Sequence, residues 1–317
     1  MRRPNRAARP PHPTPDLIET TEDLEAVCRR LAEESFVTVD TEFMRERTYW
    51  PELCVVQLAG DTEVAVVDAL AKGLDLAPLG RLMAKRNVLK VFHAARQDVE
   101  IFVLKFGAVP EPLFDTQVAA MVAGFGDQVG YDALVSSLTG APIDKAHRFS
   151  DWSVRPLSPA QIAYAAADVT HLREVYRKLR ARLESEGRLD WVAEEMAVLT
   201  DPATYQPDPD AAWERLRPRS SNRRFLAMLR TVAAWREREA QRVNVPRQRL
   251  VKDEALLEIA ATAPQNPEAL ARVRGVTRGF AEGRSGASLI AAVSEASRVP
   301  DSALPPAPNT RDAVRPS

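Results

Sequence analysis

Residues 36–42 read Phe-Val-Thr-Val-Asp-Thr-Glu, a run of apolar and polar residues that ends in two acids. Its alternation predicts a β-strand over 36–40. Because side chains two apart on a strand share a face, Asp40 and Glu42 are expected to project side by side from its carboxyl end. Ligand crevices form at such ends in open α/β sheets, so the pair is a candidate for chemistry. Alone, an Asp-x-Glu is a weak signal, because acidic pairs after strands are often turn residues or caps.

The segments around this strand predict a mixed sheet flanked by helices. Two apolar runs, at 53–59 and 64–67, are separated by Gly60-Asp61 and predict a hairpin. Strand and helix patterns then alternate, and that order predicts an α/β fold. The expected helices cover residues 20–32, 74–85, 98–106, 131–138 and 156–183, a further helix starts near 115, and a strand covers 89–92.

Length and composition predict more than one domain. At 317 residues the chain exceeds a typical single domain. A stretch rich in Pro and Asp reads as a linker, and only helical periodicity follows it. The expected parts are a disordered tail at 1–16, an α/β domain at 17–200, the linker at 201–212, a small all-α domain at 213–294 and a second tail at 295–317.

Charge is distributed unevenly although the formal net charge is only -1. Between residues 213 and 289, Arg and Lys outnumber acids by roughly two to one, the pattern of a nucleic-acid-binding surface. A solvated helical surface is the alternative.

Cysteine usage and hydropathy bear on the compartment. Cys28 and Cys54 lie in apolar surroundings without metal-ligand spacing, so we expect two reduced thiols and a cytoplasmic protein. No apolar run reaches the ~18 residues of a membrane span, and the first residues lack the apolar stretch of a secretory signal. No membrane association is expected.

Two further segments carry acids that are candidates to join Asp40 and Glu42 in one site. One runs from His93 to Asp98, and the other from Tyr164 to Asp168. Tyr164 and Asp168 are four apart and so share one helical face. The alternatives are a Tyr–Asp hydrogen bond on a surface helix and an Asp98 that stabilises a helix dipole. If all four carboxylates converge, their repulsion requires a cation such as Mg²⁺, which prefers oxygen ligands.

Two neighbouring polar residues are interpreted as structural. Asp115 is a rival carboxylate, but it precedes a helical pattern and reads as a helix cap. His93 is interpreted as a packed or hydrogen-bonded residue, because the proposed ligand set consists of oxygen atoms only.

The motifs, taken in order, resemble the DEDD exonuclease superfamily, in the subtype with a Tyr in the third motif, and within it the ribonuclease D family. Residues 36–58 resemble that family's first motif, 93–98 its second, and 150–158 with 164–168 its third. Residues 221–257 resemble the helical domain shared by RecQ-type helicases and ribonuclease D. Only one such domain fits before residue 300, whereas well-known members carry two.

The resemblance implies a fold and an activity. It implies a ribonuclease-H-like exonuclease domain at 17–200 and an HRDC-like nucleic-acid-binding domain at 213–294. The implied reaction is metal-dependent hydrolysis of RNA from the 3′ end, releasing nucleoside 5′-monophosphates from single-stranded 3′ ends and tRNA precursors. A DNA exonuclease is one alternative. A non-catalytic RNA-binding protein is another, which the presence of all five site side chains disfavours.

The resemblance also implies roles for the site residues around two divalent ions, Mg²⁺ or Mn²⁺. Asp40 would bridge both ions, while Glu42 and Asp168 would complete the first. Asp98 would hold the second through water, and Tyr164 would orient the attacking water.

Further residues near the motifs are candidates for substrate binding. Phe43 and Met44 could wedge against terminal bases, with core packing an equal alternative for Phe43. Trp152 could stack on a base or serve as a buried anchor. Arginines flanking the motifs could pair with phosphates or form ordinary surface ion pairs; these are Arg45, Arg47, Arg148 and Arg155.

Overall fold

The computed structural model describes residues 15–218 and 220–304. The outer parts of the two expected tails, residues 1–14 and 305–317, lie outside this range. The chain forms two compact units. The first comprises Glu52–Gln206 and the described residues before Arg45, and the second comprises Arg45–Pro51 and the described residues from Pro207 onward.

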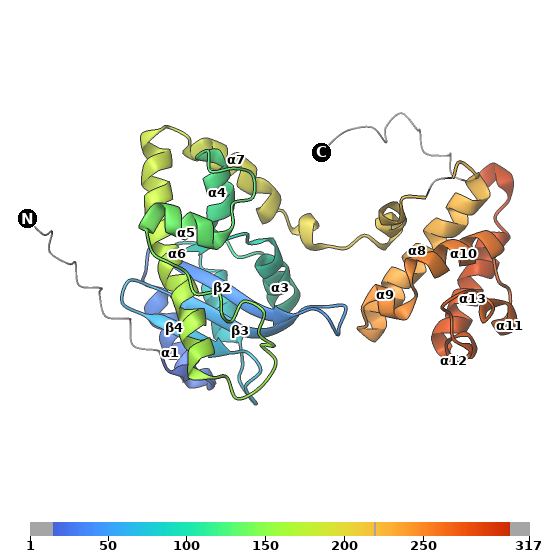
Figure 1. Cartoon of the computed structure of the whole chain (residues 1–317), viewed down its shortest axis with the longest axis horizontal. Coiled ribbons are helices and arrows are strands. Elements are labelled where there is room, and N and C mark those ends of the chain that lie inside the picture. The colour runs from blue at the N-terminus through green and yellow to red at the C-terminus, as the bar shows by residue number, and fades with distance from the viewer. Residues whose placement is uncertain (1–14, 219, 305–317) are drawn as a thin grey trace, which may run out of the picture. The chain divides into compact units, whose positions relative to one another are not determined.

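The first unit is built on a mixed sheet that has six strands among the described residues, in the order β1-β4-β3-β2-β5-β6 (Figure 1). β3 is antiparallel to β2 and to β4, whereas the pairs β1–β4, β2–β5 and β5–β6 are parallel. The predicted hairpin and mixed sheet are therefore confirmed. The strands are β1 (Leu17–Ile18), β2 (Phe36–Met44), β3 (Glu52–Ala59), β4 (Val64–Asp68), β5 (Leu89–Phe92) and β6 (Leu113–Asp115).

Helices cover both faces of this sheet. α6 (Pro159–Ser185) crosses one face, where the Thr38 hydroxyl of β2 donates a 2.8 Å hydrogen bond to the main-chain oxygen of Val169 (Figure 1). Val37 and Val39 alternate with Thr38, so their side chains leave the opposite face of the strand, and both belong to the main hydrophobic core. The remaining helices of this unit are α1 (Thr21–Leu31), α2 (Ala77–Met83), α3 (Arg96–Phe106), α4 (Thr116–Val122), α5 (Tyr131–Thr139) and α7 (Leu189–Thr200).

Local sequence explains where the long helix begins. Ser158 caps α6 by accepting a 3.2 Å hydrogen bond from the Gln161 N–H, and the Gln161 side chain bonds back to the Ser158 N–H. Pro159 at the first helical position is preorganised for this start. α7 was not predicted, because exposed apolar residues such as Trp191 and Val198 blur its amphipathic pattern.

β2 is longer than the sequence predicted. It runs to Met44, so Asp40 and Glu42 lie within the strand and not at its end. The reason is that β3 pairs with it throughout, placing Asp40 opposite Gln57. Within β2, only the segment from Phe36 to Thr38 pairs with β5. The acids therefore lie where β2 extends past its shorter parallel neighbour β5.

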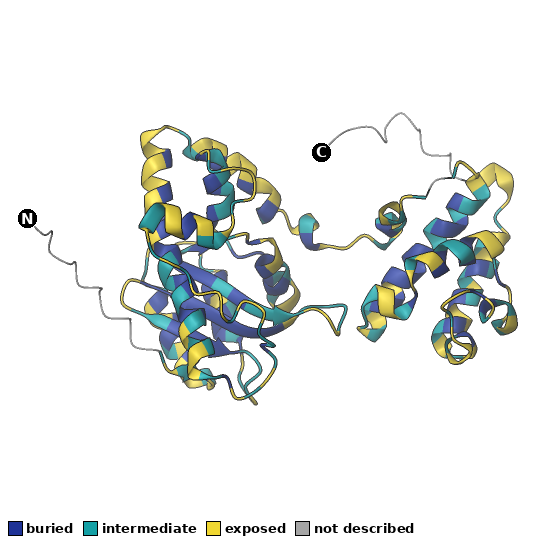
Figure 2. Cartoon of the chain, viewed as in Figure 1, coloured by how far each residue is buried: buried dark blue, intermediate teal, exposed yellow. Residues whose placement is uncertain are grey.

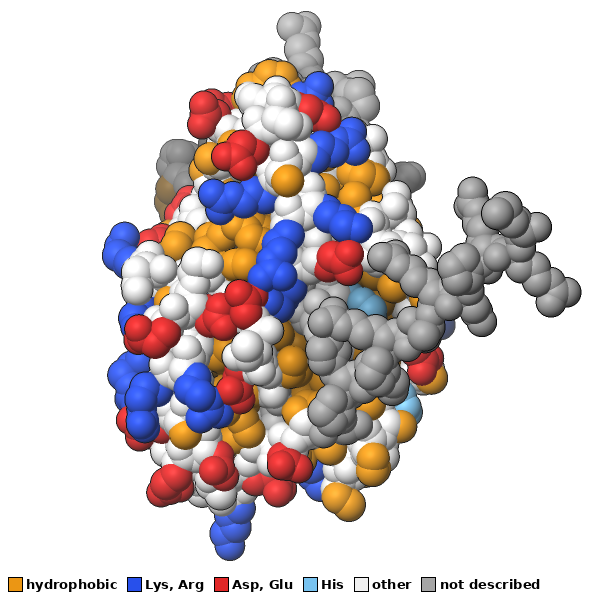
Figure 3. Space-filling view, turned by 90° about the vertical axis from the view of Figure 1, so that its left-hand side faces the viewer, with side chains coloured by type: hydrophobic (Ala, Val, Ile, Leu, Met, Phe, Trp, Pro, Cys, Tyr) orange, Lys and Arg blue, Asp and Glu red, His pale blue; other side chains and the backbone are white. Residues whose placement is uncertain are grey.

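Burial differs between the strands and the outer faces of the helices (Figure 2). The strands are mostly buried, while the outer faces of the helices are exposed. On the face shown in Figure 3, basic and acidic side chains are interspersed with hydrophobic ones. None of the helices in the described part of the chain is long and apolar enough to cross a membrane.

The second unit is helical apart from its connecting segments, as expected. Its core includes Leu229, Val232, Leu256 and Leu289, all fully buried. The stretch interpreted as a linker holds 3-10 turns, η1 (Pro202–Tyr205) in the first unit and η2 (Pro209–Leu216) in the second, and a third turn, η3, covers Asp301–Ala303. The α-helices are α8 (Arg223–Val243), α9 (Arg247–Leu250), α10 (Asp253–Thr262), α11 (Pro267–Leu270), α12 (Arg278–Glu282) and α13 (Arg284–Ser297).

Candidate active site

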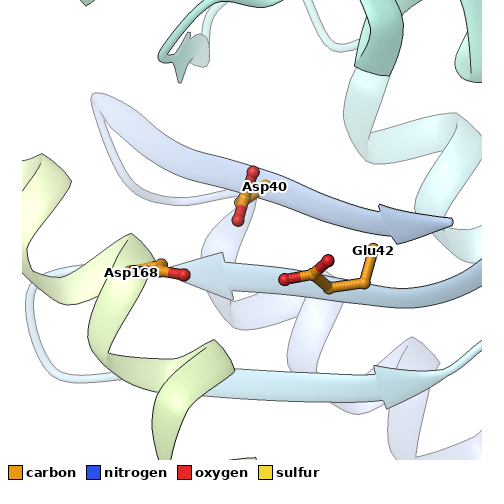
Figure 4. A group of neighbouring side chains, drawn as sticks. All are labelled: Asp40, Glu42 and Asp168. Carbon is orange, nitrogen blue, oxygen red and sulfur yellow. The ribbon is translucent and has the colours of Figure 1, made fainter. Parts of the chain in front are cut away.

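Three carboxylates converge between β2 and α6. One oxygen each from Asp40, Glu42 and Asp168 lies within 4.8 Å of the others (Figure 4). Asp40 and Glu42 share the face of β2 that α6 crosses, and Asp168 projects toward them from α6. Strand alternation on one element and helix placement on the other thus create the cluster.

The fourth acid, Asp98, approaches from a different direction. It lies in the first turn of α3 and accepts a hydrogen bond from the Thr41 hydroxyl. Thr41 alternates with Asp40 and Glu42, so its side chain leaves the opposite face of β2. Asp98 still interacts electrostatically with the cluster, since burial and then the charge on Asp40 raise its pKa.

The pKa values of all four carboxyls are raised. Burial is the main cause, raising the pKa of Asp40 to about 6, that of Asp168 to about 8 and that of Glu42 to about 9. Neighbouring carboxylates add to the shift of Glu42, with Asp40 contributing most among them. Burial also raises the pKa of Asp98. These causes raise the pKa values by disfavouring the ionised forms of the buried, mutually repelling carboxyls.

This donor set fits a divalent cation. The atoms offered are carboxylate oxygens, the ligands that hard cations such as Mg²⁺ prefer. Buried carboxylates without a cationic partner are costly, and a bound metal ion removes that cost.

Tyr164 borders the cluster on the same helix. Its hydroxyl forms a hydrogen bond with the Asp168 carboxylate. Burial, followed by the charges of Asp168 and Glu42, holds the pKa of Tyr164 well above its usual value. The phenol therefore stays neutral and acts as a hydrogen-bond donor, not as a base.

Asp115 and His93 have structural roles, as expected. Asp115 caps α4 by accepting from the Gln117 N–H at 2.7 Å. It also accepts from the N–H groups of Ala94 and Ala95, at 3.0 and 2.8 Å, and so holds the turn that leads into α3. The Nδ1 atom of His93 lies 3.0 Å from the Thr116 hydroxyl oxygen.

Sequence reasoning missed Tyr131. This residue opens α5, and its hydroxyl donates to the main-chain oxygen of Asp168 and accepts from the Leu172 N–H. Its ring centroid lies 5.3 Å from that of His93. A buried tyrosine hydroxyl usually needs a partner, but no spacing in the sequence connects position 131 with 168.

Arg155 uses its donors inside the protein. It pairs with Asp68 through two hydrogen bonds, of 2.6 and 2.8 Å. Its remaining N–H groups donate to the main-chain oxygens of Trp152, Val154 and Cys54. These bonds occupy all five N–H donors of a guanidinium. Binding of a phosphate by Arg155 stays a prediction, and it requires one of these bonds to break.

The other substrate-binding candidates differ in position. Trp152 is only 2% exposed, and its ring centroid lies 6.1 Å from that of Tyr164. Phe43 is half-buried against the main core, and Met44 packs beside Trp152 in a smaller cluster. Arg45 belongs to the second unit. Their substrate contacts stay predictions.

A pocket of about 280 Å³ lies beside the cluster. It is enclosed by α6 and by the segment that precedes it. The lining residues include Asp144, His147, Tyr164, Asp168 and His171.

Family models match both parts of the chain. Residues 15–184 match a family described as 3′-5′ exonuclease, and residues 225–293 match the HRDC domain. Curated relatives decide the family. Ribonuclease D of Granulibacter bethesdensis is 68% identical over 314 residues, covering 99% of this chain and 80% of that protein. Ribonuclease D of Gluconacetobacter diazotrophicus is 70% identical over 305 residues, covering 96% and 78%.

The chain belongs to the ribonuclease D family. Its fold agrees with the crystal structure of Escherichia coli RNase D at a TM-score of 0.84 and 31% identity, covering 94% of this chain and 79% of that one. As a ribonuclease D, the chain is a 3′-5′ exoribonuclease. The family resemblance and the fold expected from the sequence are thus confirmed, and the alternative of a non-catalytic binding protein is excluded.

Proposed function

We propose that the cluster of Asp40, Glu42, Asp98 and Asp168 is the exoribonuclease site and that it holds two divalent ions, Mg²⁺ or Mn²⁺. The observation that carries the proposal is the convergence of three carboxylates within 4.8 Å, with pKa values raised by burial and by one another. Asp40 would contribute to both ion positions, Glu42 and Asp168 would help to hold the first ion, and Asp98 would help to hold the second.

Each residue has a distinct task in this scheme. Bound divalent ions lower the pKa of water and stabilise charge on the attacking and leaving oxygens of an in-line displacement. Tyr164, as a neutral phenol beside Asp168, orients the attacking water by hydrogen bonding. Thr41 fixes the Asp98 carboxylate by donating to it. The products are nucleoside 5′-monophosphates.

We further propose that the substrates are 3′ ends of structured RNA, including tRNA precursors, in the cytoplasm. The E. coli structure is described as an exoribonuclease involved in structured RNA processing, and that likeness supports the assignment. The excess of Arg and Lys in residues 213–289 supports a role for the helical unit in attracting RNA phosphates. The buried free cysteines Cys28 and Cys54 are consistent with a reducing compartment.

A 3′-end degradation assay tests both proposals. The substrates are 5′-labelled RNAs, one a tRNA precursor with a 3′ extension and one unstructured, each incubated with Mg²⁺, Mn²⁺ or a chelator. We expect stepwise shortening that needs a metal, and a precursor that is trimmed to near its mature end. Turnover in chelator would refute the metal site, whereas equal and complete destruction of both RNAs would refute only the substrate assignment.

A further inference from the structure

The segment between α5 and α6, here called the α5–α6 loop (residues 140–158), is fixed at both ends. Near its start, Lys145 pairs with Asp132 of α5 at 2.5 Å. Near its end, Arg155 pairs with Asp68 of β4 at 2.6 Å. Between these ion pairs, Trp152 is buried beside Tyr164. The loop therefore has a defined position against the unit that carries the acidic cluster.

The tip of this loop presents an aromatic ring and a cation to solvent. Phe149 is 92% exposed, more than any other large hydrophobic side chain in the described ranges. The guanidinium of Arg148 lies 5.5 Å from the centroid of its ring. Two main-chain hydrogen bonds shape the tip, from the Arg148 N–H to the Lys145 oxygen and from the Ser150 N–H to the His147 oxygen.

The tip is directly connected to the wall of the active-site pocket. His147 lines the pocket together with Tyr164 and Asp168, and its ring centroid lies 6.0 Å from that of Tyr164. Arg148 and Phe149 follow His147 immediately in sequence. The tip therefore adjoins the pocket that lies beside Asp168.

We propose that Phe149, with Arg148, is a stacking platform that holds one base of the RNA strand upstream of the 3′-terminal linkage. An exposed aromatic ring binds any base through its π-face, and a neighbouring guanidinium adds electrostatic attraction. Such binding is independent of base identity, which suits an exonuclease that must accept each new 3′ end. The inference rests on the proposed location of the exoribonuclease site.

The chain contains a matched control for this pair. On α7, Arg188 lies 5.6 Å from the ring centroid of Trp191, and Trp191 is 57% exposed. α7 begins only after the end of α6, whereas Asp168 lies in the first half of α6. The two pairs share their chemistry, but Arg148 and Phe149 follow a residue that lines the pocket beside Asp168. The α7 residues Leu189 and Val192, near Trp191, line a different pocket.

The test compares Phe149→Ala, Phe149→Trp and Trp191→Ala in the full chain. We measure kcat and KM on a 5′-labelled, unstructured oligoribonucleotide, and the Kd for the same RNA in chelator. Phe149→Ala is expected to raise KM and Kd roughly tenfold with kcat nearly unchanged. Phe149→Trp should restore binding, and Trp191→Ala should behave as the unmodified protein.

An abasic scan locates the base that stacks. RNAs with a single abasic nucleotide at each position from the 3′ end are bound to the unmodified protein and to Phe149→Ala. At one upstream position the abasic change should weaken binding to the former and leave the latter unaffected. Equal Kd values for both proteins at every position overturn the platform. Because Kd is measured without turnover, this result is separable from a failure of the proposed catalytic cluster, which Asp40→Asn tests by loss of kcat.

Discussion

Thr41 donates a hydrogen bond to the Asp98 carboxylate from the face of β2 opposite to Asp40 and Glu42. One strand therefore contributes to the site from both of its faces. Asp98 is buried, and a buried carboxylate needs hydrogen-bond donors; the Thr41 hydroxyl is one of them. Thr41 is thereby the residue that fixes the fourth carboxylate relative to the other three.

Replacement of Thr41 by Val should impair the second metal position. The variant keeps the branched shape of the side chain but removes the donor to Asp98. We expect kcat to fall at least tenfold, consistent with a net loss of about 1.5–3 kcal/mol for a hydrogen bond to a charged group. Titration of activity against Mg²⁺ should show a higher half-saturating concentration. Thr41→Ser retains the hydroxyl, and loss of activity in that variant would argue against the hydrogen bond as the cause.

Removal of one charge from the cluster should abolish activity and stabilise the metal-free protein. In Asp168→Asn, or in Asp40→Asn, a metal ligand is lost, so turnover should disappear while RNA binding remains. In chelator above about pH 9, where the carboxyls of the folded protein are ionised, the same change relieves carboxylate repulsion, and a gain of about 1 kcal/mol raises Tm by ~2–4 °C. In Mg²⁺ the unmodified protein should have the higher Tm, because the metal binds and stabilises it and not the variant. Near-normal turnover of either variant would contradict the assignment.

The stability of the metal-free protein should also fall as pH rises. The folded-state pKa values of Asp40, Asp168 and Glu42 are about 6, 8 and 9, above their unfolded values near 4. Between pH 4 and 9 the unfolded chain has released protons that the folded chain retains, so unfolding becomes easier. Thermal unfolding in chelator across this range measures the effect. Asp61→Asn is the contrasting control, since Arg173 lowers the pKa of Asp61, and its removal should destabilise the protein.

Tyr164→Phe should separate rate from metal binding. The phenol is neutral and donates to Asp168, so its loss leaves the carboxylates in place. We expect kcat to fall by about 10²-fold, within the range for a positioned proton-transfer or water-orienting group, while Mn²⁺ affinity changes little. Single-turnover kinetics and Mn²⁺ titration monitored by electron paramagnetic resonance give the two quantities. Unchanged turnover would remove Tyr164 from the mechanism.

Tyr131→Phe should weaken metal binding without disrupting the fold. The change removes the hydroxyl that bonds to the main chain of α6 at Asp168 and Leu172. We expect a several-fold higher half-saturating Mg²⁺ concentration, reversible at high Mg²⁺. Tyr205→Phe is a matched control, because its buried hydroxyl donates in the same way to the Leu199 oxygen, at 2.7 Å, away from the cluster. If both variants shift the Mg²⁺ requirement equally, Tyr131 has only a general structural role.

The parts of the site that could be predicted follow local geometry. Asp40 and Glu42 share a face because strands repeat every two residues, and Tyr164 and Asp168 share one because helices bring residues four apart together. The contacts of Tyr131 and Thr41 were not predictable, because they join segments distant in sequence. In the fold, too, local patterns predicted individual strands and helices, whereas contacts between distant segments were not predictable.

The expected end of β2 was wrong for a related reason. Local pattern placed the end near Asp40, but pairing with β3 extends the strand to Met44. Pairing is a property of two strands, and one strand's sequence does not contain it. Arg155 illustrates the same limit, since its position beside two motifs suggested phosphate binding, whereas its donors are used by Asp68 and main-chain oxygens.

The raised pKa values of the carboxyls make loading of the site a competition between protons and metal ions. Near neutral pH, Glu42 and Asp168 hold protons in the metal-free protein, because their pKa values are about 9 and 8. Ions must displace those protons to reach the oxygens, so the apparent affinity for metal rises with pH. Proton release on metal addition, measured in buffers of different ionisation enthalpy, counts the carboxyls that change state. The activity of this ribonuclease D thereby responds jointly to the acidity and the free divalent metal of its surroundings.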